Sequence, residues 1–101
     1  MNNSFKDNVN YILELNEQEL KRLSKLVNEV INNRIKDEEL LSNLFDYLLS
    51  LLFIDESKLR VVYYKLVNYV NTFNTNLAEI YDEFYKQDFM EEKSLNQIKN
   101  R

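Results

Sequence analysis

The feature that most constrains this chain is that none of its 101 residues is glycine or proline. Glycine adopts positive φ angles without a steric cost, and proline presets the φ angle of many turns. The tight turns that connect neighbouring β-strands depend on such residues. The sequence therefore argues against a β-rich fold and favours an all-α one.

Four residues have the side chains that typically begin helices. Asn16, Asp37, Asp55 and Asn76 can each accept a hydrogen bond from a backbone N–H of the turn that follows. Beyond each of them, apolar residues recur every three or four positions, as in an amphipathic helix. We therefore expect helices at residues 17–33, 38–52, 56–73 and 77–92.

The residues before Asn16 allow two interpretations. Val9, Ile12 and Leu13 continue the apolar stripe of the following helix, which would give one long first helix. Asn16 and Glu19 have the spacing of a capping box, which would instead leave a separate short helix over residues 4–15. Because a cap is a more specific signal than a continuing stripe, we expect the separate short helix.

Short connections between helices of similar length favour antiparallel neighbours. The expected architecture is an all-α, antiparallel four-helix bundle with an additional short N-terminal helix, or with a long first helix. A chain of this length has room for one core, which we expect within residues 1–92. The apolar pattern dissolves over residues 93–101, where we expect a frayed tail.

The chain lacks the residues on which most enzymatic and metal chemistry depends. It contains no histidine and no cysteine, so the commonest general base, the thiolate nucleophile and the usual zinc ligands are missing. The acidic run at residues 37–39 suits a capped first helical turn, because neighbouring side chains on a helix diverge too far to meet on one ion. We expect no enzyme, no cofactor and no metal site.

Charge and hydropathy also narrow the location and the partners. The formal net charge of −4 disfavours binding to nucleic acid, where a basic face dominates affinity. The longest apolar run, at residues 48–54, is too short to span a bilayer, and the first residues lack the apolar stretch of a secretory signal. We expect a cytoplasmic protein with a protein partner.

The middle of the chain is more apolar than one buried stripe requires. Asp46 is the one charged residue between positions 40 and 54, and the next helix is rich in valine and tyrosine. Either these two helices form the inner pair of the bundle, which we favour, or part of their surface meets a partner, including a second copy of the chain. The candidate partner surface comprises Phe45, Leu49, Phe53, Tyr63, Tyr64, Lys65 and Tyr69.

Three segments carry a resemblance to a known family: Leu-Val-Asn-Glu-Val at residues 26–30, Asp-Glu-Glu-Leu-Leu at 37–41 and Tyr-Lys-Leu-Val-Asn-Tyr-Val at 64–70. In order and spacing they resemble the immunity proteins of pediocin-like (class IIa) bacteriocins, over about residues 20–86. The chain departs from that family in its N-terminal extension, in Lys65 where an arginine is usual, and in its C-terminal tail.

The resemblance implies a four-helix bundle of a Gram-positive bacterium that protects its producer. Such a protein would bind the toxin-engaged membrane receptor, a permease, from the cytosol, without catalysis. The alternative is a small regulator or inhibitor of mobile-element or phage type, which binds a host protein or a nucleic-acid complex. A homodimeric structural module is a third hypothesis.

Overall fold

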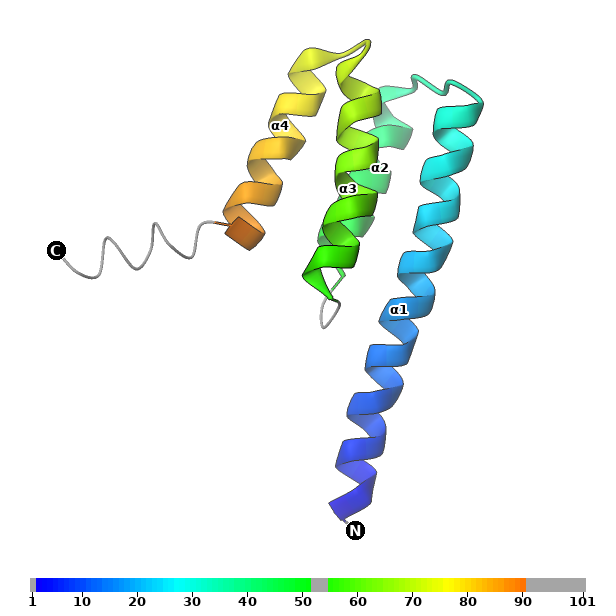
Figure 1. The fold of residues 1–101 in the computed structure, drawn as a ribbon, viewed down its shortest axis with the longest axis vertical. Helices are drawn as coiled ribbons and strands as arrows, with labels where there is room; N and C mark the ends of the chain where they lie inside the picture. The colour runs from blue at the N-terminus through cyan, green and yellow to red at the C-terminus, as the bar shows by residue number, and fades with distance from the viewer. Residues whose placement is uncertain (1, 52–54, 91–101) are drawn as a thin grey trace, which may run out of the picture.

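The computed structural model describes residues 2–51 and 55–90, and these residues form four α-helices. The elements are α1 (Asn2–Asn32), α2 (Glu38–Leu49), α3 (Glu56–Asn71) and α4 (Thr75–Tyr85), followed by a π-helical turn, η1 (Lys86–Met90). Successive helices run in opposite directions (Figure 1), and no strand occurs among the described residues. The predicted all-α four-helix bundle is confirmed. The expected tail at 93–101 lies outside the described residues.

The N-terminal part of the chain differs from what we expected. α1 is one continuous helix of 31 residues, so the long first helix is right and the separate short helix is wrong. Asn16 lies inside α1 and does not begin it. Adding one more residue to an existing helix costs far less than nucleating a new one, and no glycine or proline interrupts this stretch. Half of α1 therefore projects beyond the other helices (Figure 1).

The caps of α2 and α3 are those that the sequence predicts. Asp37 accepts a hydrogen bond from the Leu40 N–H at 3.0 Å, and Asp55 accepts one from the Ser57 N–H at 3.0 Å. Each aspartate has an extended backbone conformation, as an N-cap residue should.

The start of α4 was predicted two residues too late. Asn74, and not Asn76, is the N-cap, and its side chain accepts a hydrogen bond from the Leu77 N–H at 3.1 Å. The reason lies in the end of α3, because the Asn74 N–H bonds back to the Val70 carbonyl at 2.8 Å. The chain turns at this hydrogen bond, so Asn74 is the first residue after α3 that can cap a new helix. Asn76 therefore lies within the first turn of α4.

The turn after α1 needs a residue with positive φ, and this chain has no glycine to supply it. Arg34 takes the position, with φ of 53°, at a steric cost of about 1–2 kcal/mol. The Arg34 N–H bonds to the Ile31 carbonyl at 3.2 Å and the Ile35 N–H to the Val30 carbonyl at 3.0 Å. This pattern is a Schellman motif, and it turns Ile35 back against the core.

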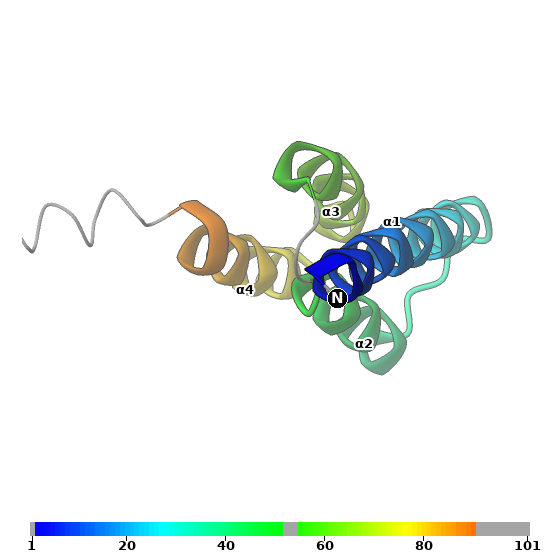
Figure 2. The ribbon, with the colours of Figure 1, turned by 90° about the horizontal axis from the view of Figure 1, so that it is seen from below.

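One apolar core joins the four helices. Figure 2 shows α1 and α4 on opposite sides of the molecule with α2 and α3 between them, and α3 contacts all three of the other helices. Phe45, Tyr63 and Tyr85 are fully buried, and the Phe45 ring stacks on Tyr81 with 4.4 Å between the ring centres. The Tyr63 hydroxyl donates a hydrogen bond to the Tyr81 carbonyl at 2.5 Å. These four aromatic residues therefore belong to the core.

The two asparagines near the start of α4 offer a matched test of the observed cap. We expect Asn74→Ala to lower the free energy of unfolding by about 1 kcal/mol, because the Leu77 N–H loses its acceptor. Asn76→Ala should change it by less than about 0.5 kcal/mol or raise it slightly, because alanine is the better helix former. Urea unfolding followed by circular dichroism measures both. Equal losses at the two positions would contradict the assignment.

Candidate functional site

A groove with a volume of about 520 Å³ lies between the C-terminal half of α1 and α2. Its apolar walls combine residues of both helices with Ile35 from the connecting turn, and polar and acidic residues form its edge. The Schellman turn at Arg34 closes one end, because it holds Ile35 against the last turn of α1. The lining residues are Leu26, Glu29, Val30, Asn33, Ile35, Asp37, Glu39, Leu40, Asn43, Leu44 and Tyr47.

The α2 side of the groove exposes two large apolar side chains. Leu40 is 43% exposed and Tyr47 is 59% exposed, while Leu44 between them is buried. These residues are four and then three positions apart, so they follow one row along α2. An apolar row that stays open to solvent beside a groove is typical of a surface that binds another protein.

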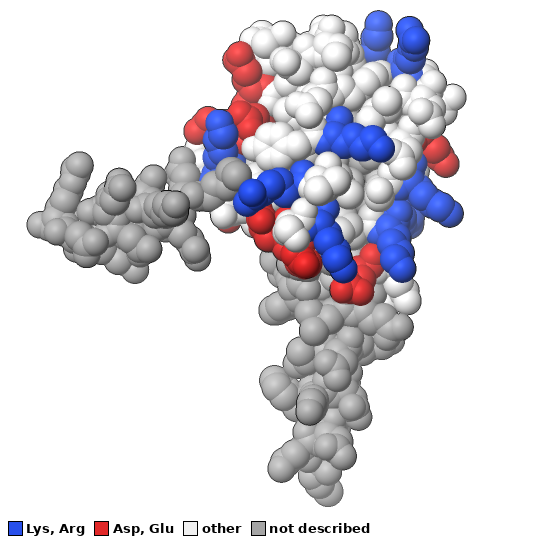
Figure 3. All heavy atoms as spheres, viewed as in Figure 1, with Lys and Arg blue, Asp and Glu red and all other residues white. Residues whose placement is uncertain are grey.

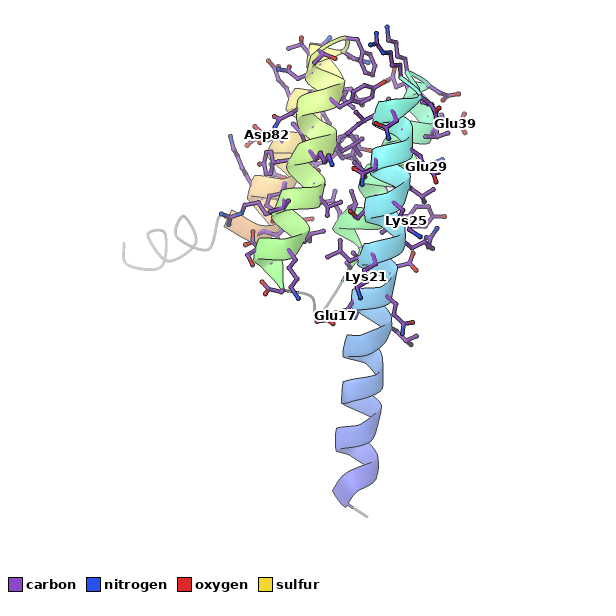
Figure 4. The ribbon with its side chains drawn as sticks, turned by 45° about the vertical axis from the view of Figure 1, so that its right-hand side comes forward. Glu17, Lys21, Lys25, Glu29, Glu39 and Asp82 are labelled. Carbon is purple, nitrogen blue, oxygen red and sulfur yellow. The ribbon has the colours of Figure 1, made fainter. Side chains whose placement is uncertain are left out.

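The charges on the groove are all negative. Glu29, Asp37 and Glu39 line it, and none of the lining residues is lysine or arginine. The Asp37 carboxylate caps α2, but Glu29 and Glu39 form no ion pair with another described side chain. Figure 4 shows Glu29 on α1 and Glu39 on α2 on the same side of the molecule, away from Asp82 on α4.

No lysine or arginine lines the groove, although Arg34 and Lys36 lie in the turn that contributes Asn33, Ile35 and Asp37 to it. The helix α2 contains no lysine or arginine, whereas the face that α1 and α3 form carries several of them among uncharged residues (Figure 3). Lys21, Lys25 and Lys65 are exposed on these two helices. The charged side chains that line the groove are therefore all acidic.

Two members of the predicted partner surface are not on the surface. Phe45 and Tyr63 are each 0% exposed, so this part of the prediction is wrong. The physical reason is that their rings lie 5.2 Å apart, between centres, in the aromatic core, where burial of a large ring stabilises the fold most. The Tyr63 hydroxyl also has its partner inside, on the Tyr81 carbonyl.

The remaining members do not form one surface. Tyr64 is half-buried and donates to Asp82 on α4 at 2.6 Å, whereas Tyr69 is half-buried and donates to the Ile35 carbonyl at 2.7 Å. Lys65 is exposed and donates to the Asn28 side chain on α1. Leu49 is half-buried on α2, and Phe53 lies outside the described residues. The hydrogen bonds of Tyr64, Lys65 and Tyr69 connect α3 to α4, to α1 and to the turn after α1, respectively.

The sequence pattern alone did not identify the groove residues Leu26, Leu40 and Tyr47 as a group. A signal for them exists, since α2 carries two apolar rows side by side. One row, with Leu41 and Leu48, is buried, and the second row, with Leu40 and Tyr47, borders the groove. Only one of two such rows can face the core, so the other becomes a candidate surface.

Tyrosine–carboxylate hydrogen bonds stabilise the side of the bundle opposite the groove. The Tyr85 hydroxyl donates to Glu56 at 2.5 Å and lowers the pKa of that carboxyl, with Arg60 adding to the effect. The hydrogen bond from Tyr64 likewise lowers the pKa of Asp82. Burial raises the pKa of both tyrosines well above their usual range, so their hydroxyls stay protonated donors.

Among the described side chains, no three histidine, cysteine, aspartate or glutamate residues are grouped to hold a metal ion. Within residues 2–51 and 55–90, no helix combines the length and the apolarity that crossing a bilayer requires.

No protein-family model, no curated protein and no solved structure matches this chain. The resemblance to the class IIa immunity proteins therefore stays a prediction. The groove and its charge are the observations from which a function can be argued.

We expect stability to fall on acidification because the folded pKa values of Glu56 and Asp82 lie below their unfolded values. Their contribution is complete above the unfolded pKa values, about 4.3 and 3.9, and is lost as the pH falls through the folded values. Replacing Tyr64 and Tyr85 by phenylalanine should reduce the loss of unfolding free energy between about pH 5 and pH 3 by roughly 1 kcal/mol. The effect is no larger than this because both carboxylates are partly exposed to solvent. Tyr47→Phe is the control, and an unaltered pH profile in the double variant would refute the expectation.

Proposed function

We propose that the protein is a non-enzymatic binding module whose groove between α1 and α2 receives a basic, amphipathic segment of another protein. The observation that carries this proposal is an open apolar groove whose lining charges are all acidic. Charged residues at the edge of an interface choose the partner and its orientation, while the apolar floor supplies most of the affinity.

The occupant that we propose for the groove is a helix. A helix lying along the groove would place apolar residues of one face against Leu26, Leu40 and Leu44, as in other helix-in-groove complexes. Lysine or arginine residues flanking that face would then meet Glu29 and Glu39. Tyr47 adds an aromatic side chain at the open edge, which is a frequent anchor of protein interfaces.

The most specific form of the proposal is immunity to a class IIa bacteriocin. In that form the protein acts in the cytoplasm, and the groove holds a basic segment of the toxin-engaged membrane permease. The resemblance at residues 26–30 and 37–41 supports this form, because both segments contribute lining residues to the groove. The rival form, a mobile-element or phage-type regulator, uses the same groove for a basic segment of a host protein. Nucleic acid does not suit the acidic edge.

Reversing the charge of the groove tests the proposed chemistry directly. The probe is a synthetic helical peptide with leucine on one face and lysine on the other. We expect Glu29→Lys with Glu39→Lys to weaken its binding at least about tenfold in fluorescence anisotropy, because two attractive pairs become repulsive. Added salt should reduce the difference in peptide affinity between the wild-type protein and the double variant, because it screens the charges.

The matched control changes two exposed glutamates of α4, away from the groove, Glu79→Lys with Glu83→Lys. It alters the net charge by the same amount and should retain most of the affinity. If the control weakened binding as much as the groove variant, general charge would explain the effect and the groove would have no role.

The immunity form has its own test. A sensitive Gram-positive strain that expresses the protein is challenged with a panel of class IIa bacteriocins, and protection against at least one of them is expected. The Glu29→Lys, Glu39→Lys variant should lose that protection while accumulating to the same level. Unchanged sensitivity to every peptide would remove the immunity form. A polymerase or nuclease complex recovered with the wild-type protein would favour the rival form.

A further inference from the structure

Lysine residues gather along the seam between α1 and α3. At one end of the seam, the Lys58 amine of α3 lies 3.9 Å from the Glu17 carboxylate of α1. Farther along, Lys65 of α3 donates a hydrogen bond to the Asn28 side chain of α1. Glu17 and Asn28 are about 16 Å apart along α1, since each residue adds about 1.5 Å to a helix. The lysines of α3 therefore follow the seam over this length.

Three more lysines complete this surface. Lys21 and Lys25 lie on α1 between the two contacts and are four positions apart, so they follow one row of the helix (Figure 4). In the turn after α1, the Lys36 amine lies 5.6 Å from the centre of the Phe73 ring, just beyond the end of α3. Figure 3 shows basic side chains spread over this side of the molecule. The lysine face consists of five exposed residues, Lys21, Lys25, Lys36, Lys58 and Lys65.

Acidic side chains neutralise little of the lysine face. Lys58 is its one member that forms an ion pair with another described side chain, and its partner Glu17 is similarly exposed. An exposed pair of this kind contributes little free energy, so the Lys58 amine stays available to another anion. Glu29, one helical turn after Lys25, lines the groove on the α2 side of α1. The lysine face is therefore locally cationic.

An apolar side chain lies among the lysines of α3. Val61 is 70% exposed, more than any other large apolar residue that the structure describes. It comes three positions after Lys58 and four before Lys65, so the three residues share one row of the helix. Lysines around an exposed apolar side chain are typical of a surface that lies on a bilayer, with amines at the lipid phosphates and the apolar group at the acyl boundary.

We propose that the lysine face binds the surface of a lipid bilayer that contains anionic lipids. A lysine amine is a compact point charge, which a fluid layer of headgroups satisfies without a fixed geometry. Each lysine near such a surface strengthens binding by about fivefold. Nucleic acid is another polyanion, but a phosphate backbone offers Val61 no apolar environment. The inference rests on α1, α3 and the turn between α1 and α2, and it does not depend on the proposed function of the groove.

The formal net charge of −4 does not oppose this contact, because the bilayer senses local charge. At physiological ionic strength, salt screens exposed charges that are more than about 8 Å apart. Figure 2 shows α2 and α3 on opposite sides of the molecule, and the axes of packed helices alone are about 8–10 Å apart. The acids of α2 therefore lie beyond the screening distance from the outer side of α3, and α2 stays away from the bilayer.

Cosedimentation with vesicles tests the proposed charge recognition. The probes are vesicles of phosphatidylcholine alone and vesicles with phosphatidylglycerol as about a third of the lipid. We expect the protein to bind the anionic vesicles at least about tenfold more strongly, and Lys21→Gln with Lys25→Gln to remove most of that preference. Equal binding to both kinds of vesicle, or none to either, would overturn the proposal.

The matched control adds the same two negative charges on the C-terminal helical segment, with Asn76→Asp and Gln87→Glu at exposed positions of α4 and η1. It should bind anionic vesicles nearly as well as the wild-type protein. A loss equal to that of the lysine variant would show that total charge governs binding and would contradict a local face. Circular dichroism checks that both variants keep the bundle.

A single tryptophan reports which side of the molecule meets the lipid, because the chain has none of its own. With anionic vesicles, Val61→Trp should shift its emission to shorter wavelength and become protected from a water-soluble quencher. Tyr47→Trp, at a 59% exposed position of the groove, should do neither. Equal responses at the two positions would overturn the proposed orientation. Tighter binding to duplex DNA than to vesicles at equal phosphate concentration would assign the lysine face to nucleic acid instead.

Discussion

The packing of Tyr63 against the other helices is the interaction on which the rest of the structure depends. This residue of α3 is fully buried, and its ring lies 5.2 Å from Phe45 of α2 and 4.7 Å from Tyr85 of the last turn of α4. Its hydroxyl would cost free energy if it were buried without a partner, and the Tyr81 carbonyl of α4 accepts its hydrogen bond. One side chain therefore fixes the rotation of α2 and α4 about their axes relative to α3.

The rotation of α2 has a direct consequence for function. Because Phe45 and Leu48 face the core, the neighbouring row with Leu40 and Tyr47 turns toward the edge of α1 and stays exposed. The turn at Arg34 then sets the separation of α1 and α2. The groove is thus a consequence of core packing on one side and of a strained turn on the other, and the charges that line it are acidic.

Much of the fold could be predicted from local signals. The caps at Asp37 and Asp55 were correct, because each aspartate precedes a clear amphipathic segment and nothing upstream competes for it. Asn16 and Asn76 were wrong as caps. A cap forms only where the preceding helix has ended. α1 continues through Asn16, so this residue cannot begin a helix. After the end of α3, Asn74 comes before Asn76 in the chain and is the residue that caps α4.

The candidate site was harder to predict for a different reason. An apolar surplus identifies a helix with two apolar rows, but it does not say which row the neighbouring helices cover. Phe45 and Tyr63 have the composition of an interface and the position of a core, whereas Leu40 and Tyr47 look like ordinary stripe residues and remain exposed. Only the relative rotation of α1, α2 and α3 distinguishes the two cases.

We propose that partners bind at the groove and not at another exposed apolar residue. Site-specific photo-crosslinking in the cells that produce the protein tests this claim most directly, with p-benzoylphenylalanine in place of Tyr47 or of Ile80. The two side chains are similarly exposed, at 59% and 48%, but only Tyr47 lines the groove. We predict one discrete adduct from position 47 that disappears in the Glu29→Lys, Glu39→Lys background. An adduct from position 80 alone, or none from position 47, would contradict the account.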